Sequence, residues 1–307
     1  MLSISRHFKG EKGAASIIVA LCMTVLLGFT ALVIDVGIIT SEKSRISNAA
    51  DAAALAGAQE LIRDKSNVYN VVNQYLESNS VDPVDAEIVV FDSDTKVGVT
   101  VKEEVDYYFA RILGFDKNNV KAEAVAMCAP VIGIYEGIRP FAIEQQTLEF
   151  EQTYTLKEGG GSGSNGNYGA LALSGNGAST YVRNIVEGYD GYLRVGDYVD
   201  TEPGNMSGPT SQGINTLISH CTHIPRCTYN QYDEDCPRII TVIMVESLDV
   251  NGRSEVRIAG FAKFFLIEVE GHGRESIVTG KFIKMVMSGD LGETQTDFGL
   301  KGVKLIK

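Results

Sequence analysis

The hydrophobic pattern of the chain begins with one long apolar run. Residues 14–34 contain no charged side chain. At about 1.5 Å per residue, such a run forms a helix of roughly 31 Å, the thickness of a bilayer's hydrocarbon core. A cleaved secretory signal is the alternative, but its apolar region is shorter, at about 7–15 residues, with a cleavage site close behind. We therefore predict a retained transmembrane helix over residues 14–34.

Helical spacing continues after the span to about residue 64, and one face of that segment carries small side chains. Spacings of three, four and seven place them in one stripe. Small side chains let a helix approach a sheet or a second helix closely, although alanine also favours helix by propensity alone. We also predict a short second helix over residues 67–78. The predicted helix interaction face comprises Ile39, Ile46, Ala50, Ala53, Gly57 and Leu61.

A period of two then replaces the helical period. Residues 86–92 and 97–104 alternate around a turn and predict a hairpin, and residues 119–130 predict a third strand. Between them, residues 105–115 have helical spacing and predict a further helix. The expected unit over residues 35–130 is α+β, with the long amphipathic helix packed on a small antiparallel sheet.

The hydrophobic pattern and the composition change after residue 130. Residues 131–157 suggest a linker followed by a strand, and residues 158–169 are a Gly/Ser-rich loop by composition. From residue 170 to residue 307 short apolar runs alternate with Gly, Asn and Asp turns. We expect a β-rich C-terminal domain there, either a sandwich or an open barrel.

The charged residues predict how the chain is oriented in the membrane and which classes of partner it can bind. Arg6, Lys9 and Lys12 precede the span and Asp35 follows it, so the positive-inside rule keeps residues 1–13 in the cytoplasm. The bulk of the chain is then extracytoplasmic on a single-pass cell-membrane protein. The net charge of -12 argues against nucleic acid as a partner.

The order of these features is similar to that of a known family. An apolar span, an Asp-Val-Gly sequence at its end, a polar helix and the tract NAADAAALAGA follow one another within residues 12–61. This region resembles the TadE/TadG-like proteins of bacterial Flp (Tad) pilus assembly, in a short form without a von Willebrand A domain. The glycines near the span, Gly10 and Gly13, lack the Glu five residues on that prepilin processing needs.

The resemblance implies a role and a set of partners. It implies a membrane-anchored, extracytoplasmic structural component of pilus assembly that acts through helix–helix and protein–protein contacts. Its implied partners are the Tad assembly-platform proteins or the pilin, with homo-oligomerisation left open. A membrane-tethered module that binds the cell wall or another surface ligand is the first alternative, and an envelope hydrolase with a dispersed site is the second.

The cysteines carry the main candidate chemistry. Cys22 lies within the span and fits a small apolar filler. The disulfide candidates are Cys128, Cys221, Cys227 and Cys236, all on the predicted outer side, where three pairings are possible. His220 and His223 next to them raise the alternative of zinc, which takes four soft ligands, but the spacing fits no regular zinc pattern. We expect at least one disulfide and no metal, with free thiols as the remaining possibility.

The sequence contains no recognisable motif for catalysis or phosphate binding. The chain has no Gly-x-Ser-x-Gly sequence, no recognisable catalytic histidine and no Gly-rich phosphate loop. Asp197, Asp200 and Glu202 lie in a segment of turn formers whose spacing does not match an EF-hand calcium loop. We therefore predict no catalytic residue and no cofactor.

Overall fold

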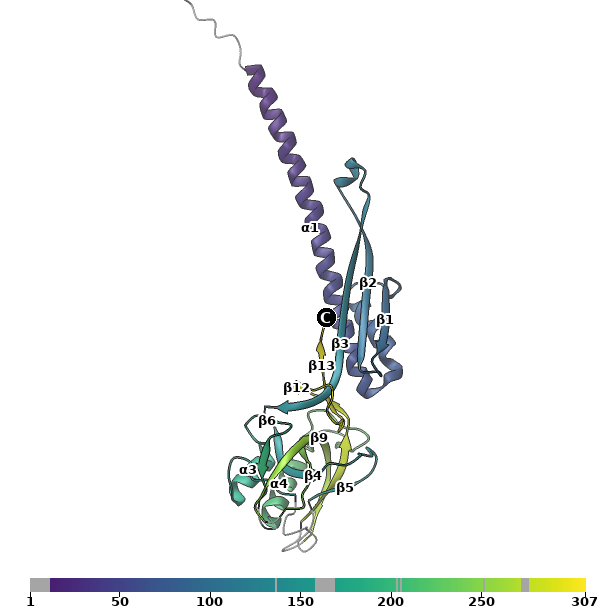
Figure 1. Ribbon diagram of the computed structural model, residues 1–307. Helices are drawn as coiled ribbons and strands as arrows, with labels where there is room; N and C mark the ends of the chain where they lie inside the picture. The colour runs from purple at the N-terminus through teal and green to yellow at the C-terminus, as the bar shows by residue number, and fades with distance from the viewer. Residues whose placement is uncertain are drawn as a thin grey trace, which may run out of the picture.

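The computed structural model describes residues 12–135, 137–157, 169–202, 204, 206–250, 252–271 and 276–307. The molecule is elongated, with a rod-like helix at one end and a rounded β-rich domain at the other (Figure 1). Between them, a helix–sheet module lies along the second half of the rod. The predicted α+β class is confirmed. The predicted Gly/Ser-rich loop falls outside the described residues except for Gly169.

The rod is one continuous helix, α1 (Lys12–Arg63). Its first part exposes its apolar side chains on all sides, from Ile17 to Val36. Among the described residues it is the one helix long and apolar enough to cross a membrane. A helix that is apolar all round and unburied by its own chain is suited to lipid.

The second half of α1 packs against the rest of its own chain. Ala49, Ala53 and Ala58 are fully buried, and the helix contacts strands β2 (Lys96–Asp106) and β3 (Lys117–Ile134). The short helix α2 (Val68–Ser78) lies against it as well. The predicted interaction face is this buried side, with Ile39 at its half-buried upper end. The chain's own sheet and α2 occupy this face, which is the close packing that its small side chains allow.

The helix–sheet module is completed by the end of the chain. Among the described residues its sheet has seven strands, with the path β1-β2-β3-β13-β11, while β12 and β6 pair with β3 beside it. The C-terminal strand pairs antiparallel with β3, with Val303 opposite Cys128. The predicted boundary at residue 130 is thus not a break: β3 runs through it, and β13 returns across it. The remaining members are β1 (Ala86–Phe91), β6 (Leu193–Arg194), β11 (Met285–Val286), β12 (Asp290–Leu291) and β13 (Leu300–Leu305).

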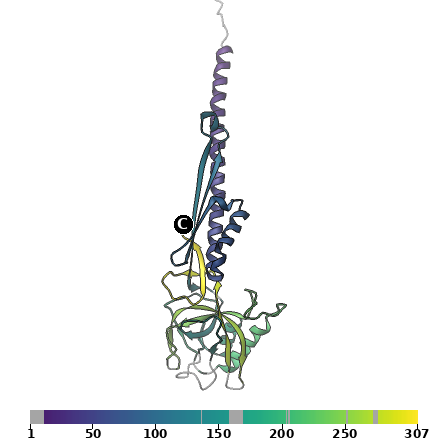
Figure 2. The same ribbon diagram turned by 90° about the vertical axis from the view of Figure 1, so that its right-hand side faces the viewer.

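Strands β2 and β3 form a long hairpin whose tip reaches along α1 toward the span (Figures 1 and 2). The predicted helix over residues 105–115 is wrong. Pairing continues to Asp106 opposite Lys117, and only one turn of 3₁₀ helix, η3 (Ala110–Leu113), lies at the tip. Gly114, in the left-handed conformation with φ of 89°, ends that turn. The apolar residues of this segment have helical spacing. The pairing of β2 with β3 nevertheless continues into the segment and takes up its first two residues.

The outer domain is built on a curled sheet, with the path β4-β8-β9-β10-β5 among its six described strands and β7 paired to β9. Bulges in the pairing of β9 with β8 and β10 accompany the curl. Residues 131–141 do not form the predicted linker, because β3 extends to Ile134 and β4 begins at Ile138, which is fully buried. The strands are β4 (Ile138–Glu144), β5 (Tyr154–Lys157), β7 (Tyr198–Asp200), β8 (Ile239–Val245), β9 (Glu255–Glu270) and β10 (Ile277–Ile283).

The two faces of this sheet are covered differently. One face packs under helices α3 (Ala178–Val186) and α4 (Ser207–Ser219), which bury Tyr181, Ile185 and Ile214. Neither helix is predicted by the sequence pattern, because both are short and rich in Ser, Thr and Gly, which are weak helix formers. The other face packs under the loop that follows α4 and contains three cysteines.

Candidate functional site

The junction between the span and the hairpin tip depends on one carboxylate. Asp35 directly follows the predicted span and is 2% exposed. Its two oxygens accept hydrogen bonds from the backbone N–H groups of Tyr108 (2.8 Å) and Ala110 (2.7 Å), and Phe109 donates to the same carboxylate. These donors begin η3 and have no partner within the turn, so Asp35 satisfies them as a cap would.

The same hydrogen bonds set the protonation of Asp35. Burial alone would raise its pKa, but the backbone donors of Ala110, Tyr108 and Phe109 together hold the pKa below the ordinary 3.8. The folded pKa is therefore lower than the unfolded one. The stabilisation is fully present above the unfolded pKa and is lost as the pH falls through the folded value.

We expect Asp35→Asn to release the hairpin tip from α1, because a neutral amide turns an N–H₂ group toward backbone donors. Amide hydrogen exchange at residues 108–110 should accelerate at neutral pH by about tenfold or more, since a charge-assisted contact is lost. Asp51→Asn, on the same helix, is the matched control and should leave these amides unchanged. Unaltered protection in the Asp35 variant would show that the tip is held by other contacts.

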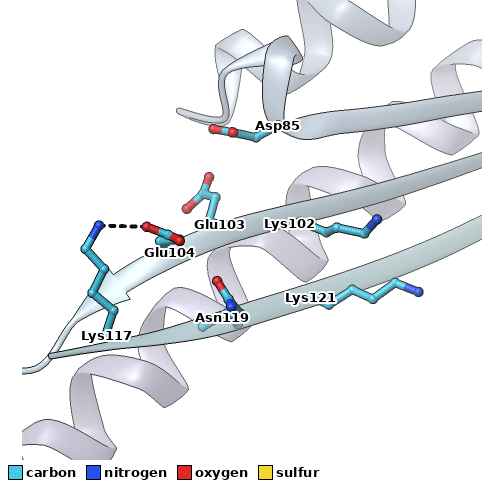
Figure 3. A pocket seen from close by; sticks show the side chains of 8 residues that line it. Asp85, Lys102, Glu103, Glu104, Lys117, Asn119 and Lys121 are labelled. Atoms are coloured by element: carbon cyan, nitrogen blue, oxygen red, sulfur yellow. Dashed lines mark hydrogen bonds and ion pairs between the residues drawn. The ribbon is translucent and has the colours of Figure 1, made fainter. Parts of the chain in front are cut away.

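Below this junction, an open recess lies between η2 (Pro83–Asp85), the hairpin strands and their charged side chains (Figure 3). Lys117 pairs with Glu104 at 2.7 Å. Arg45 of α1 bonds Glu42 at 2.7 Å and also contacts Glu103, so it ties the helix to β2. The residues that line the recess are Asp85, Lys102, Glu103, Glu104, Lys117, Asn119, Val120 and Lys121. Mixed, mutually paired charges of this kind are typical of a solvated face.

The structure separates the predicted disulfide candidates into two groups. All five cysteines lie within the described residues, and each is free. Cys128 is buried between α1 and the sheet of the helix–sheet module, where burial raises its pKa to about 11. The other three candidates lie together against the outer domain, so the structure does not bring Cys128 near them. The predicted disulfide is not formed in this structure.

Three cysteines and a histidine converge in the loop after α4. The donor atoms of Cys221, His223, Cys227 and Cys236 all lie within 4.8 Å of one another. The three thiols are buried, and the Cys221 Sγ is 3.8 Å from His223 Nδ1. His220, the other histidine named from the sequence, ends α4 and stands outside this group. The spacing is Cys-x-His-x₃-Cys-x₈-Cys, so the residues were visible in the sequence but their convergence was not.

Polar contacts fix the loop around these four side chains. Arg238 donates to the carbonyl oxygens of Cys227 and Leu266, each at 2.9 Å, which ties the loop to strand β9. The second ring nitrogen of the histidine, His223 Nε2, is 3.9 Å from a carboxylate oxygen of Asp233. The backbone N–H of Cys236 donates to the Asp233 carbonyl at 3.0 Å. The donor atoms are thus held by the fold itself.

The environment of Cys221 favours its thiolate. Burial alone would raise its pKa, but hydrogen bonds with the His223 ring, with the Cys227 backbone and with the Cys236 thiol lower it to about 6. Burial raises the pKa of Cys236 to about 12. The group therefore combines one readily ionised thiol with two further sulfur donors and an imidazole, which is a donor set for a soft metal ion.

Two of the three acids considered for calcium accept hydrogen bonds from the backbone. Asp197 accepts a hydrogen bond from the Arg194 N–H at 2.8 Å, and Glu202 accepts one from the Gly177 N–H at 3.2 Å. Among the described residues, these acids belong to no group of metal-ligating side chains.

Comparison with known proteins bears on the anchor. Residues 13–60 match the model of a family described as putative Flp pilus-assembly, TadE/G-like. The N-terminal region is a TadE/G-like domain. The resemblance inferred from sequence is confirmed over this range, and the match ends within α1, three residues before Arg63. Neither the curated proteins nor the solved structures contain a significant match to the chain.

The extent of the TadE/G-like domain matters for its interpretation. It comprises the apolar span and the small-residue half of α1, but neither sheet. In this chain the matched region is therefore a helix with an apolar, unburied first half and a second half packed on its own sheet. This part supports a pilus-related role and membrane association.

Proposed function

We propose that this chain is a membrane-anchored, extracytoplasmic component of a Flp (Tad) pilus system that acts through protein–protein contacts. The observation that supports this most directly is that the TadE/G-like domain is the anchor helix itself. Its small-residue half is buried by the chain's own sheet, so contacts with pilus or platform helices would fall on the exposed apolar span.

The shape of the molecule suits a component that works at a distance from the membrane. Basic residues precede the span and Asp35 follows it, which favours a cytoplasmic N-terminus. From Asp35 to Arg63 the helix rises about 40 Å at 1.5 Å per residue. The outer domain at the far end of this rod would then meet the pilin, the wall or a partner protein.

The test is recovery of partners from the native host. The full-length chain would be solubilised from membranes, captured and analysed by mass spectrometry. We expect Tad platform proteins or the pilin to be enriched. A control variant in which residues 14–34 are replaced by an unrelated single-pass helix should remain in the membrane and lose these partners.

Other outcomes would overturn the proposal. Recovery of wall fragments or unrelated surface proteins alone would favour a membrane-tethered binding module. Equal recovery of Tad proteins by the control variant would leave the pilus role intact and overturn only the assignment of the contacts to the span.

A further inference from the structure

We propose that Cys221, His223, Cys227 and Cys236 bind one zinc ion, which fixes the loop over residues 221–236. Zinc in structural sites takes four Cys or His ligands in a tetrahedron. With Zn–S near 2.3 Å and Zn–N near 2.0–2.1 Å, such ligand atoms stand about 3.5–3.8 Å from one another. The separation of 3.8 Å between Cys221 Sγ and His223 Nδ1 agrees with this, and no pair of donor atoms in the group is farther apart than 4.8 Å.

The surroundings of the histidine support a metal and not a disulfide. His223 turns Nδ1 toward Cys221, while its Nε2 faces the carboxylate of Asp233 at 3.9 Å. A zinc-bound imidazole commonly directs its second nitrogen to a carboxylate, which fixes the ring's orientation. A disulfide would use two of the three thiols and leave one thiol and the imidazole without a role. One tetrahedrally coordinated ion would account for all four converging ligand atoms.

The loop also touches the anchor helix. Glu234, between Cys227 and Cys236, forms an ion pair with Arg63, the last residue of α1, at 2.7 Å. Arg238 holds the other side of the loop to β9 through Cys227 and Leu266. A bound zinc ion would therefore make this loop a rigid brace between the rod and the outer domain.

The test uses the full-length chain purified in detergent without chelator. We expect about one zinc ion per chain by plasma mass spectrometry, and cobalt substitution should give thiolate-to-metal absorption bands. Cys227→Ser should lower bound zinc by about tenfold or more, because outright loss of a ligand removes the tetrahedral site. Cys128→Ala, a buried cysteine outside the group, is the matched control and should keep the zinc.

A measurement on the wild type protects the test against a variant that fails to fold. Thiol titration of the denatured protein should find all five cysteines reduced. A wild-type chain that binds no zinc or cobalt, or that has a disulfide within residues 221–236, would overturn the proposal. Full zinc retention in a folded Cys227→Ser variant would do so as well.

A second inference concerns the hairpin tip, and it rests on a different observation. We infer that the tip of the β2–β3 hairpin inserts into the outer interface of the bilayer beside the span. Five apolar or aromatic side chains stand exposed there, with Ile112 84% and Leu113 79% exposed. The full set is Tyr108, Phe109, Ile112, Leu113 and Phe115.

The position of the tip indicates that its exposed side chains contact lipid. Asp35 holds the tip at the residue directly after the span, so these side chains lie level with the end of the apolar surface of α1. Leu32, Val33 and Val36 are exposed on the helix at the same level. The two surfaces are thus continuous. Aromatic and aliphatic side chains at the height where a span ends are typical of the membrane interface.

The chain contains no tryptophan, which permits a direct test with single reporters. Ile112→Trp would be placed in proteoliposomes whose lipids carry bromine as a quencher. Val84→Trp, at a position 89% exposed beside the recess, is the matched control. We expect quenching at position 112 to exceed that at position 84 by at least about twofold, as for a side chain at the acyl boundary.

This inference depends on insertion of the span but not on a role in pili. Flotation of the proteoliposomes with the full chain would establish insertion separately. With the span inserted, equal quenching at positions 112 and 84 would overturn lipid contact. Protection of position 112 only when a Tad protein is added would assign the tip to a protein partner instead.

Discussion

Truncation after Gly299 is expected to destabilise the helix–sheet module by at least about 3 kcal/mol, although the cut removes the end of the chain. The lost strand, β13, pairs with β3 from Lys301 to Leu305. Leu300 is 1% exposed, and Val303 packs against the core under α1. The cut would also leave the edge of β3 unpaired in the middle of a sheet.

Hydrogen exchange along β3 and thermal unfolding in detergent would measure this effect. Exchange of the amides over residues 126–130 should accelerate together with a lower melting temperature. Lys304→Ala, an exposed position on the same strand, is the control and should change neither. If the truncated chain keeps both its β3 protection and its melting temperature, β13 adds nothing to the stability of the module.

Gly57→Leu is expected to destabilise the packing of α1 on its own sheet by about 3 kcal/mol or more. A Cβ at this position would stand 2.5 Å from a methyl group of Val72 in α2 and 3.2 Å from one of Val97 in β2. A leucine adds three further carbons in the same space. Because α2 and β2 close on the helix at this point, one of them has to move away.

A second glycine of the same helix supplies the control. Gly37 would place a Cβ with no other atom within 4 Å, so Gly37→Leu should fold normally. We expect it to gain up to about 1 kcal/mol from helix propensity. Thermal unfolding followed by circular dichroism would compare the two variants. Equal melting temperatures would mean that the small-residue face is not packed within the chain.

Local patterns were enough for the parts of the fold that depend on neighbours in sequence. The apolar run, the helical stripe from Ile39 to Leu61 and the alternation in β1 and β2 each correspond to an observed element. The family of the N-terminal region followed from the same tract, and residues 13–60 confirm it. A period of 3.6 or 2 is sufficient for such elements because each residue's environment repeats along the element.

Local pattern failed where a distant segment decided the outcome. Residues 105–110 have helical spacing, yet the ladder between β2 and β3 and the carboxylate of Asp35 make them the tip of a hairpin. Residues 131–141 have the pattern of a linker, yet β3 extends to Ile134 and Ile138 of β4 pairs with Thr241 of β8.

By itself, the sequence determined the membrane span, the small-residue helix, the hairpin and the α+β class, since each follows from short-range periodicity. Only the tertiary structure decided what each surface meets. It placed the small-residue face against the chain's own sheet and returned β13 to β3. It also brought Cys221, His223, Cys227 and Cys236 together despite an irregular spacing. The physical reason is the same in each case: strand pairing and ligand convergence are set by three-dimensional closure of long loops, which no local period encodes.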